Sequence, residues 1–437
     1  MHPWRGRVND PKGANPGFLA WIRGVFRGPS GARGGWITPP RRGSLCCVSH
    51  HRAWAEIDLD AVSHNLAVVR RRAGAGVRVL LVVKADAYGH GAVAVAHHAL
   101  RLGVEALGVG TSAEALELRE HGLRVPILVL GTIVDEEAAP ALRQGIEIGI
   151  HSTDRVHMLA EVARRLGRVA RVHLNVDTGM GRLGVLPESA LRLLMEIRRA
   201  PHLELAGVMT HVSAASGALD PESRRQVEAF EAVLDAARGA GIHPGMVHLA
   251  NSAALFTGLG PTYDAVRPGI SAYGILPGGL PGAAELRPAM ALCSQVVFLK
   301  DVPAGARVGY DSTWSARSAT RIATLPLGYN DGVPWRLGNR GEVLVRGQRA
   351  PIVGRVSMDY TTIDVGHVRD VAVGDRVVLF GRDGDDDLRV EEVARKAGTI
   401  AYEITCSVGK RVPRLYLGGE EGAPAEAARA LEPAPAG

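Results

Sequence analysis

The sequence predicts an α/β protein with two folded domains, a (β/α)8 barrel of the TIM type followed by a C-terminal, mostly β domain. The chain has 437 residues, which is more than one ordinary domain uses. From Val77 to Arg267, short apolar runs alternate with amphipathic helical stretches, as strands and helices do in a barrel. Beyond Leu286 the runs are short and β-branched, with turn residues between them, which is typical of a mostly β domain.

Eight apolar runs are predicted to be the barrel strands. Most of them are continuous rather than alternating, as expected for parallel strands that are buried on both faces. The runs are 77–83, 106–110, 127–130, 146–150, 171–176, 205–209, 246–249 and 264–267. Helical patterns separate them, and they include 112–120, 153–166, 188–199 and 224–239. Thr111, Ser152 and Pro187 are start signals just before three of these helices.

The second domain is predicted from five strand-like segments, which are 294–300, 321–326, 341–345, 360–365 and 375–380. One helix, 390–397, follows them. The strand-like segment 54–59 precedes the barrel and is expected to pair with the β domain. The predicted boundaries are therefore 51–60 for this strand, 61–286 for the barrel and 287–417 for the β domain.

The two ends of the chain lack the pattern of a folded domain. Residues 1–50 are rich in Gly, Pro and Arg, and we expect them to be disordered or the true start to lie near Val48. The tail 418–437, mostly Ala, Glu, Pro and Gly, is also expected to be disordered. Residues 1–50 carry eight basic residues and one acidic residue, a net charge of +7. Because the whole chain has a net charge of +6, the remaining residues have a net charge of 6 − 7 = −1. We therefore expect no nucleic-acid surface on the folded body.

The composition also indicates the cellular compartment of the protein. No apolar run is long enough to cross a bilayer, so no membrane partner is expected, and the apolar segment 17–26 is interrupted and makes a poor signal peptide. Neither a disulfide framework nor a zinc spacing emerges from the cysteines. They are Cys46, Cys47, Cys293 and Cys406. We expect a cytoplasmic protein with reduced thiols and no metal site.

A lysine directly follows the first barrel strand. Lys84 comes after the run 77–83 and before a polar, glycine-containing segment, 85–91. A lysine at the carboxyl end of a buried parallel strand points into the crevice where α/β proteins bind ligands. Desolvation there would let Lys84 lose its proton and bond covalently to an aldehyde cofactor. The alternative is a surface lysine that caps the strand.

Polar residues also end four of the other strands. They are 177–182 after the fifth strand, Thr210 and His211 after the sixth, Asn251 and Ser252 after the seventh, and 267–269 after the eighth. Singly, each suits a plain structural role as a turn, a loop histidine or a helix cap. Because the carboxyl ends of barrel strands share one face, their joint placement predicts one shared cavity.

Longer motifs run through both predicted domains. In the barrel they are 82–91, 177–184, 209–211, 251–252 and 266–270, and in the β domain they are 308–310, 327–332, 354–359, 402–403 and 411–414. In this order the motifs resemble the alanine racemase family from about Trp54 to about Leu417. The resemblance implies a racemase that uses pyridoxal 5′-phosphate (PLP), anchored through Lys84.

The residues at the predicted barrel mouth suit that cofactor. Backbone amides near Gly269 and Ile270, with the hydroxyls of Ser252 and Tyr88, are expected to hold the phosphate. Arg267 is expected to donate to the ring nitrogen. Since a guanidinium stays protonated, that nitrogen would remain unprotonated. The ring would then be a weaker electron sink, which disfavours side reactions such as transamination.

The resemblance further implies two bases, one for each face of the substrate. Lys84 matches the base that serves D-alanine, and Tyr310 matches the base that serves L-alanine. His211, bonded to Arg267, matches the histidine that supports the tyrosine. A tyrosine needs such support because its ordinary pKa near 10 makes it a poor base.

The resemblance also assigns the remaining candidate residues. Arg182 matches the arginine beside the phenolate and the substrate carboxylate, and Met358 matches the residue whose backbone amide meets that carboxylate. Tyr329 and Tyr402 match tyrosines of the access route and the phosphate site, and Asn251 belongs to the cofactor-binding motif with Ser252.

In the family, Tyr310, Met358 and Tyr329 reach the active site from the partner subunit. The resemblance therefore implies a head-to-tail homodimer with two shared active sites. It also implies a role in supplying D-alanine for bacterial peptidoglycan.

Three positions depart from the family pattern. Asn175 stands where many members carry a carbamylated lysine that orients the arginine matched by Arg182. Asp311 follows Tyr310 where glycine is common, and Trp335 stands where many members have an arginine in the access route. The segment 212–216 also differs from the usual aromatic and acidic residues. These departures bear on the breadth of substrates more than on the type of reaction.

Three alternatives remain open from the sequence. A broad-specificity amino-acid racemase would suit Asn175, although such enzymes are usually exported. A PLP-dependent decarboxylase on the same architecture would need a glycine-rich phosphate triplet, which the chain lacks. A non-catalytic PLP-binding barrel protein would lack the β domain that carries Tyr310.

Overall fold

The computed structural model describes residues 51–213, 220–278 and 280–419. The predicted disorder of residues 1–50, and of the tail beyond Gly419, lies outside these described residues. Cys46 and Cys47 also lie outside them. Of the two described cysteines, Cys293 is buried, Cys406 is exposed, and both are free thiols.

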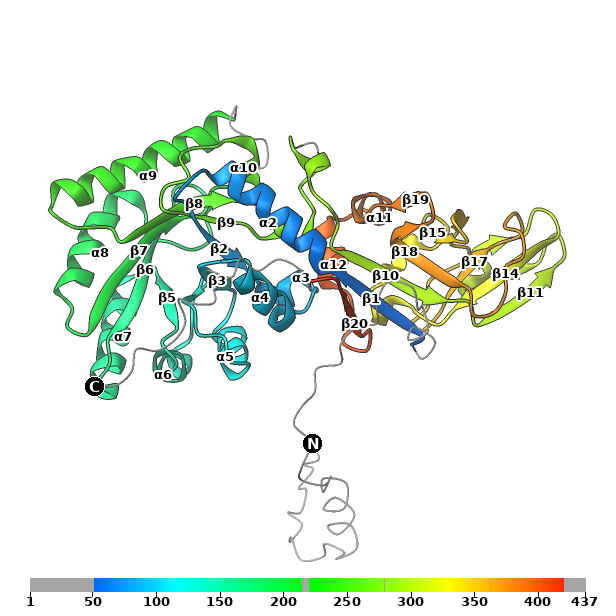
Figure 1. The fold of residues 1–437 in the computed structure, drawn as a ribbon, viewed down its shortest axis with the longest axis horizontal. Coiled ribbons are helices and arrows are strands. Elements are labelled where there is room, and N and C mark those ends of the chain that lie inside the picture. Colours follow the sequence, from blue (N-terminus) through cyan, green and yellow to red (C-terminus); the bar gives the residue numbers. More distant parts are fainter. Residues whose placement is uncertain (1–50, 214–219, 279, 420–437) are drawn as a thin grey trace, which may run out of the picture. The chain divides into compact units, whose positions relative to one another are not determined.

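The predicted eight-stranded parallel barrel is confirmed (Figure 1). Each strand pairs in parallel with the next, and the first pairs with the last to close the barrel. The strands are β2 (Arg78–Val82), β3 (Ala106–Val109), β4 (Ile127–Val129), β5 (Glu147–Ile150), β6 (Ala170–Val176), β7 (Leu203–Thr210), β8 (Met246–Asn251) and β9 (Ala265–Arg267). Each lies within about two residues of its predicted apolar run, because burial on both faces leaves a continuous apolar signal.

Helices cover the outside of the barrel, and Figure 1 shows α5 to α9 in this position. The barrel helices are α2 (Leu59–Ala73), α4 (Ala92–Arg101), α5 (Ser112–Glu120), α6 (Asp135–Arg143), α7 (Thr153–Leu166), α8 (Pro187–Arg199), α9 (Pro221–Gly239) and α10 (Ser252–Thr257). The Thr111 hydroxyl accepts from the Glu114 amide, and Ser152 accepts from the Arg155 amide, so the predicted start signals cap α5 and α7. Within the described residues, no helix is both long and apolar enough to span a membrane.

The C-terminal domain is built from three sheets. The largest has the order β16-β15-β18-β10-β1-β20, with β19 beside β18, and the smaller ones are β11-β14-β17 and β12-β13. The strands of the largest sheet are β1 (Ala53–Asp58), β10 (Met290–Gln295), β15 (Glu342–Val345), β16 (Gln348–Pro351), β18 (Arg376–Asp383), β19 (Asp386–Leu388) and β20 (Arg414–Leu417). Those of the smaller sheets are β11 (Phe298–Val302), β14 (Thr320–Leu325), β17 (Thr361–Asp364), β12 (Arg307–Val308) and β13 (Trp314–Ser315). The N-terminal strand β1 is central, since it pairs with β10 on one side and with β20 on the other.

The structure corrects one strand. The segment 294–300 was predicted as a single strand, but the chain leaves β10 after Gln295 and begins β11 at Phe298 in a different sheet. At the break, the amide of Val296 donates to Asp375, and that of Val297 donates to Thr324 of the other sheet. A continuous apolar pattern does not reveal where a chain passes between sheets, because both sheets bury the same residue types.

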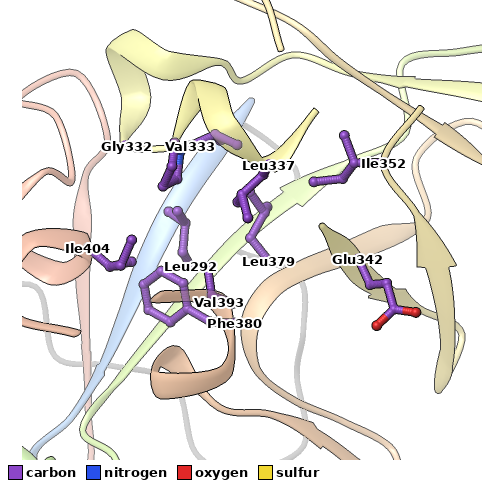
Figure 2. A pocket seen from close by; sticks show the side chains of 11 residues that line it. Leu292, Gly332, Val333, Leu337, Glu342, Ile352, Leu379, Phe380, Val393 and Ile404 are labelled. Carbon is purple, nitrogen blue, oxygen red and sulfur yellow. The ribbon is translucent and has the colours of Figure 1, made fainter. Parts of the chain in front are cut away.

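A small pocket in the core of the β domain is shown in Figure 2. Apolar side chains line it, together with one charged residue, Glu342, which pairs with Arg349 (3.3 Å) and with Lys396. The apolar lining residues include Leu292, Val333, Leu337, Ile352, Phe380 and Ile404. Since the one carboxylate is already paired, the lining offers no unpaired charged side chain, and it includes none of the candidate site residues.

Candidate active site

The candidate lysine begins a short left-handed turn, α3 (Lys84–Tyr88). Ala85, Asp86, Ala87 and Tyr88 all have φ between +52° and +54°. For residues other than glycine, this conformation costs about 1–2 kcal/mol each. Strain of this kind persists only where surrounding contacts enforce it, and it is concentrated at functional sites.

Two carboxylates hold this turn in place. The Ala85 amide donates to Oε1 of Glu114 (2.7 Å), while Oε2 accepts from the amide of Gly110 (2.7 Å). On the other side, the Ala92 amide donates to Asp86 (2.7 Å) at the start of α4. The turn is therefore anchored both to the neighbouring β3–α5 loop and to the next helix, which fixes the position of Lys84 at the end of β2.

The surroundings of Lys84 favour its neutral amine. Burial lowers the pKa of Lys84, and the positive charges of Arg182 and Arg267 lower it further, while Glu114 opposes the shift. A lysine with a lowered pKa is both a better nucleophile and a usable base near neutral pH. Lys84 is also partly buried, so the exposed lysine that merely caps a strand, which the sequence left open, does not describe its position.

Hydroxyls and amides converge beside β9, where the phosphate was predicted to bind. The amides of Gly269 and Ser271 both donate to the Ser252 hydroxyl (3.1 and 3.2 Å), and Ile270 lies between them at the start of η2 (Ile270–Tyr273). A Cβ at Gly269 would lie 2.5 Å from the Tyr88 hydroxyl. Glycine is thus required for the close approach, and the resulting cradle of amides and hydroxyls suits an anion.

Two aromatic rings flank this cradle. The Tyr88 ring lies 5.3 Å from that of Tyr273 and 6.0 Å from that of Tyr402, measured between ring centroids. Tyr402 comes from α12 (Ala401–Cys406) of the β domain, so the two domains meet at the cradle. Burial raises the pKa of Tyr402 to about 12, which keeps its hydroxyl protonated and able to donate.

Arg267 is buried at the end of β9 and is held from several directions. Its two terminal nitrogens donate to the carbonyls of Thr210, His248 and Leu249 at 2.7–3.0 Å, and to Nδ1 of His248 (2.9 Å). A longer contact reaches Nδ1 of His211 (3.4 Å). None of these bonds uses Nε, so the guanidinium is rigidly placed with one donor left for another acceptor.

The histidine beside Arg267 is kept neutral. Burial lowers the pKa of His211 to about 3, and the charges of Arg267, Arg182 and Lys84 add to this effect. Because Arg267 can only donate, Nδ1 of His211 is an acceptor, and the proton of the neutral ring is on Nε2. His211 can therefore offer a hydrogen bond from Nε2 without carrying a charge.

Two buried histidines, His90 and His248, and the partly buried His211 make the stability of the fold sensitive to acid. Burial lowers the pKa of His90 to about 4, that of His211 to about 3, and that of His248 well below its ordinary value. Below pH 6.5 the unfolded chain binds protons that these folded residues do not bind, so stability falls as the pH falls. We expect the free energy of unfolding to drop by about 3 kcal/mol between pH 6.5 and 5.5. Urea unfolding of the protein without added ligand measures this, and a constant or rising value would contradict it.

The side chains of Asn251 and Asn175 make hydrogen bonds to the backbone. The Asn251 side chain caps α10 by accepting from the Ala254 amide (2.9 Å), and it donates to the Val212 carbonyl (3.3 Å). The Asn175 amide donates to the carbonyl of Leu183 (3.4 Å), next to Arg182. Asn175 thus holds the backbone of the loop after β6, while the Arg182 side chain is exposed near Lys84. A cofactor contact of Asn251 stays a prediction.

The candidate residues of the β domain lie on adjoining loops. The Tyr329 amide donates to the Ser357 carbonyl (3.0 Å), and the Asn330 amide donates to the Met358 carbonyl (3.3 Å). Tyr329 and Met358 are therefore held together, and both are exposed, at 45% and 53%. Among the described residues, no hydrogen bond, ion pair or ring contact joins Tyr310, Tyr329 or Met358 to the barrel mouth of the same chain.

Tyr310 itself is 70% exposed. Its turn lies beside Asp311 and Trp335, two of the residues that depart from the family pattern. The carboxylate of Asp311 pairs with Nε of Arg355 (2.9 Å), whose guanidinium lies 5.0 Å from the centre of the Trp335 ring. Asp311 has φ +56°, and this ion pair holds the strained turn that carries Tyr310. Asp311 and Trp335 thus form one cluster through Arg355.

Sequence reasoning missed Glu114, His248 and His173. Glu114 is readable as part of a capping box with Thr111, but its bonds to the lysine turn depend on the pairing of β2 with β3. His248 and His173 lie inside apolar runs, where histidine carries no local signal of function. Only the closure of the barrel shows that both face the same interior.

The fold and the site define a class of protein: a two-domain barrel enzyme whose site is built around a strand-end lysine with a lowered pKa. A family model described as alanine racemase, N-terminal domain, matches residues 57–277, and one described as alanine racemase, C-terminal domain, matches residues 289–416. An alanine racemase of Symbiobacterium thermophilum is 44% identical over 368 residues, which cover 84% of this chain and 97% of that protein.

Solved structures give the same result. The alanine racemase from D-cycloserine-producing Streptomyces lavendulae has a TM-score of 0.79 at 37% identity, covering 84% of this chain and 97% of that one. The alanine racemase of Bacillus anthracis with bound L-Ala-P has a TM-score of 0.79 at 36% identity, covering 85% and 96%. The chain belongs to the alanine racemase family, and it is an enzyme of the isomerase class.

Proposed function

We propose that this chain interconverts L-alanine and D-alanine, with PLP as its cofactor and two bases acting on opposite faces of the substrate. The observation that carries the proposal is the position of Lys84, whose lowered pKa and strained, doubly anchored turn suit an amine nucleophile. When bound, PLP links covalently to an amine and withdraws electrons from the α-carbon, which makes the α-proton removable.

The barrel mouth fits the phosphate and the ring of this cofactor. The Tyr88 and Ser252 hydroxyls and the amides near Gly269 and Ile270 would hold the phosphate, with Tyr402 closing the site. Support comes from the close approach of Tyr88 to Gly269, which only glycine allows. Asn251 would support this motif from the cap of α10.

Arg267 would bind the ring nitrogen. The bonds of Arg267 to carbonyls and histidines use its two terminal nitrogens, so its Nε remains as a donor for the ring. A guanidinium does not give up its proton near neutral pH, so the ring nitrogen would remain an acceptor. The ring would then withdraw electrons less strongly, which favours return of the proton over competing reactions.

The two bases would exchange protons with opposite faces of the α-carbon. The Lys84 amine would serve the D face, since its lowered pKa leaves it able to accept a proton. The Tyr310 hydroxyl would serve the L face, with support from the neutral His211. Arg182 and the Met358 amide would bind the substrate carboxylate, and Tyr329 would line the access route.

The β-domain residues would act in the site of a partner subunit. Tyr310, Met358 and Tyr329 are all exposed. Hydrogen bonds join the loops of Tyr329 and Met358, and the ion pair of Asp311 with Arg355 links the turn of Tyr310 to the same segment. Exposed aromatic side chains held rigidly in one cluster are typical of an interface. We therefore propose a homodimer in which each β domain completes the partner's barrel site.

The biological role that we propose is the supply of D-alanine for bacterial peptidoglycan, in the cytoplasm. The free thiols of Cys293 and Cys406 are compatible with a reducing compartment. This role rests on the proposed reaction, because D-alanine is its product.

Asn175 favours a second candidate, a broad-specificity amino-acid racemase. Incubating the purified protein and PLP with each L-amino acid, followed by chiral chromatography, separates the two. We expect D-alanine as the main product. D-lysine, D-arginine or D-serine at comparable rates would identify the broader enzyme, and no D-product at all would leave a non-catalytic cofactor-binding protein.

A further inference from the structure

A chain of hydrogen bonds crosses the interior of the barrel and ends at Arg267. Oε2 of Glu147 lies 2.9 Å from Nε2 of His173, and Nδ1 of His173 lies 2.9 Å from Nε2 of His248. Nδ1 of His248 then lies 2.9 Å from a terminal nitrogen of Arg267. All four residues are at most 5% exposed, so the chain of bonds is shielded from water over its whole length.

Donor and acceptor roles along this chain follow from one fact. Arginine can only donate, so Nδ1 of His248 must accept, and the proton of the neutral ring is on Nε2. That proton is donated to Nδ1 of His173, whose own proton is therefore on Nε2 and is donated to Glu147. One protonation pattern alone satisfies every bond: a carboxylate, two neutral imidazoles and a guanidinium.

The chain of bonds connects a buried cation to a distant carboxylate. Within the part of the chain that the structure describes, the direct hydrogen-bond partners of Arg267 are carbonyls and imidazoles, which do not neutralise its charge. Its hydrogen bonds lead through His248 and His173 to the carboxylate of Glu147. Each bond in such a chain polarises the next, so the negative charge of Glu147 strengthens the acceptor that faces Arg267.

Glu147 is fixed in its charged form at the far end of the barrel interior. Burial would raise its pKa, but the hydrogen bonds from His173 and Arg171 outweigh this effect and keep the pKa below the ordinary value. Nε of Arg171 lies 2.8 Å from Glu147, and Arg171 also pairs with the exposed Glu204. This chain of hydrogen bonds from Glu147 through His173 and His248 to Arg267, called the relay below, is thus held at the N-terminal ends of β5 and β6, opposite the face that carries Lys84.

The fold makes room for the relay. A Cβ at Gly207 of β7 would lie 2.4 Å from Nδ1 of His173 and 2.5 Å from the carbonyl of Met246. Gly207 pairs with His173 in the ladder, next to a shift in strand register after Val172. Here glycine is needed for space, because any side chain would displace the imidazole from its bond to His248.

We propose that Glu147, His173 and His248 are positioning residues that fix the orientation of Arg267 and, through it, the Nε2–H tautomer of His211. None of the three was assigned a part in the reaction above. The inference rests on the proposed function for its catalytic consequence, but its structural content, the protonation pattern, holds for the protein without cofactor.

The protonation pattern can be measured directly. Nitrogen-15 NMR of histidine-labelled protein without cofactor reports the tautomer of each ring, and His173→Gln and His248→Gln provide the assignments. We expect both histidines to be neutral, with the proton on Nε2, at pH 7. A proton on Nδ1, or a doubly protonated ring, at either residue would overturn the proposal, and this test requires no variant to be active.

The catalytic consequence is tested by Glu147→Gln, which keeps an acceptor for His173 and removes the charge. We expect kcat in both directions to fall about tenfold, as is usual for outer partners of a catalytic group, with KM changed less than twofold. The Nε2 proton signal of His173 should move upfield in the same variant without cofactor. Glu204→Gln is the matched control, since it removes a carboxylate from the same Arg171 without touching the relay, and it should behave as wild type.

Two results distinguish failure of this inference from failure of the proposed function. A Glu147→Gln protein with wild-type kcat and an unmoved His173 signal would reduce the relay to packing and overturn the inference. Wild-type protein that produces no D-amino acid would instead contradict the proposed function, while the tautomers of His173 and His248 would still decide the structural claim. If Glu147→Gln does not fold, the wild-type tautomers decide alone.

Discussion

Replacing Lys84 with alanine is expected to abolish both covalent cofactor binding and racemisation. The variant loses the amine placed at the end of β2, beside the cradle of Tyr88, Ser252 and Gly269. The visible absorbance of the purified protein with PLP should disappear, and kcat should fall at least about a thousandfold, as is usual when a nucleophile is removed. Absorbance spectra and chiral chromatography measure the two effects.

Two further variants sharpen this result. Lys84→Arg keeps a long basic side chain but not the nucleophile, and it should also lack the absorbance. Lys300→Ala, on the exposed strand β11, should match wild type in both measurements. An unchanged spectrum for Lys84→Ala after exhaustive removal of free PLP would mean that another group anchors the cofactor.

The second large effect is expected for Tyr310→Phe, which removes one hydroxyl from a 70% exposed side chain. Cofactor binding should be unaffected, because the variant leaves Lys84 and the cradle of Tyr88, Ser252 and Gly269 unchanged. Racemisation should fall by about a hundredfold or more, the usual loss when a general base is removed. The absorbance spectrum and the racemisation rate are the readouts.

Hydrogen exchange separates the two faces in this variant. In deuterated water, D-alanine should still exchange its α-hydrogen through Lys84, whereas L-alanine should not exchange. Tyr360→Phe is the control, since Tyr360 is an exposed tyrosine in the same part of the β domain. If Tyr310→Phe exchanges both enantiomers equally, Tyr310 is not the L-face base, and if it loses PLP, its role is structural.

The sequence predicted the barrel closely because local signals and burial agree there. Continuous apolar runs mark the strands, and Thr111 and Ser152 begin helices α5 and α7 at the expected positions. The strand-end residues Lys84, Ser252 and Arg267 were identifiable for the same reason, since they follow directly from the ends of the runs.

The remaining features depend on contacts that no local pattern encodes. The left-handed turn after Lys84 contains alanine, aspartate and tyrosine, which give no sign of positive φ, and it exists because Glu114 and Asp86 hold it. The ion pair of Asp311 with Arg355 joins residues 44 positions apart. The interior relay joins four different strands of the barrel, so it could be found only once their register was known.

The central claim is that Lys84 of one subunit and Tyr310 of another act on the same substrate molecule. Mixing the inactive Lys84→Ala and Tyr310→Phe proteins, with reversible dissociation to allow subunit exchange, tests it most directly. Random exchange makes half of the dimers mixed, and each mixed dimer has one intact and one doubly altered site. We therefore expect racemisation to recover to about one quarter of the wild-type rate. No recovery in a sample shown to contain mixed dimers would contradict the claim, because both bases would then have to come from a single chain.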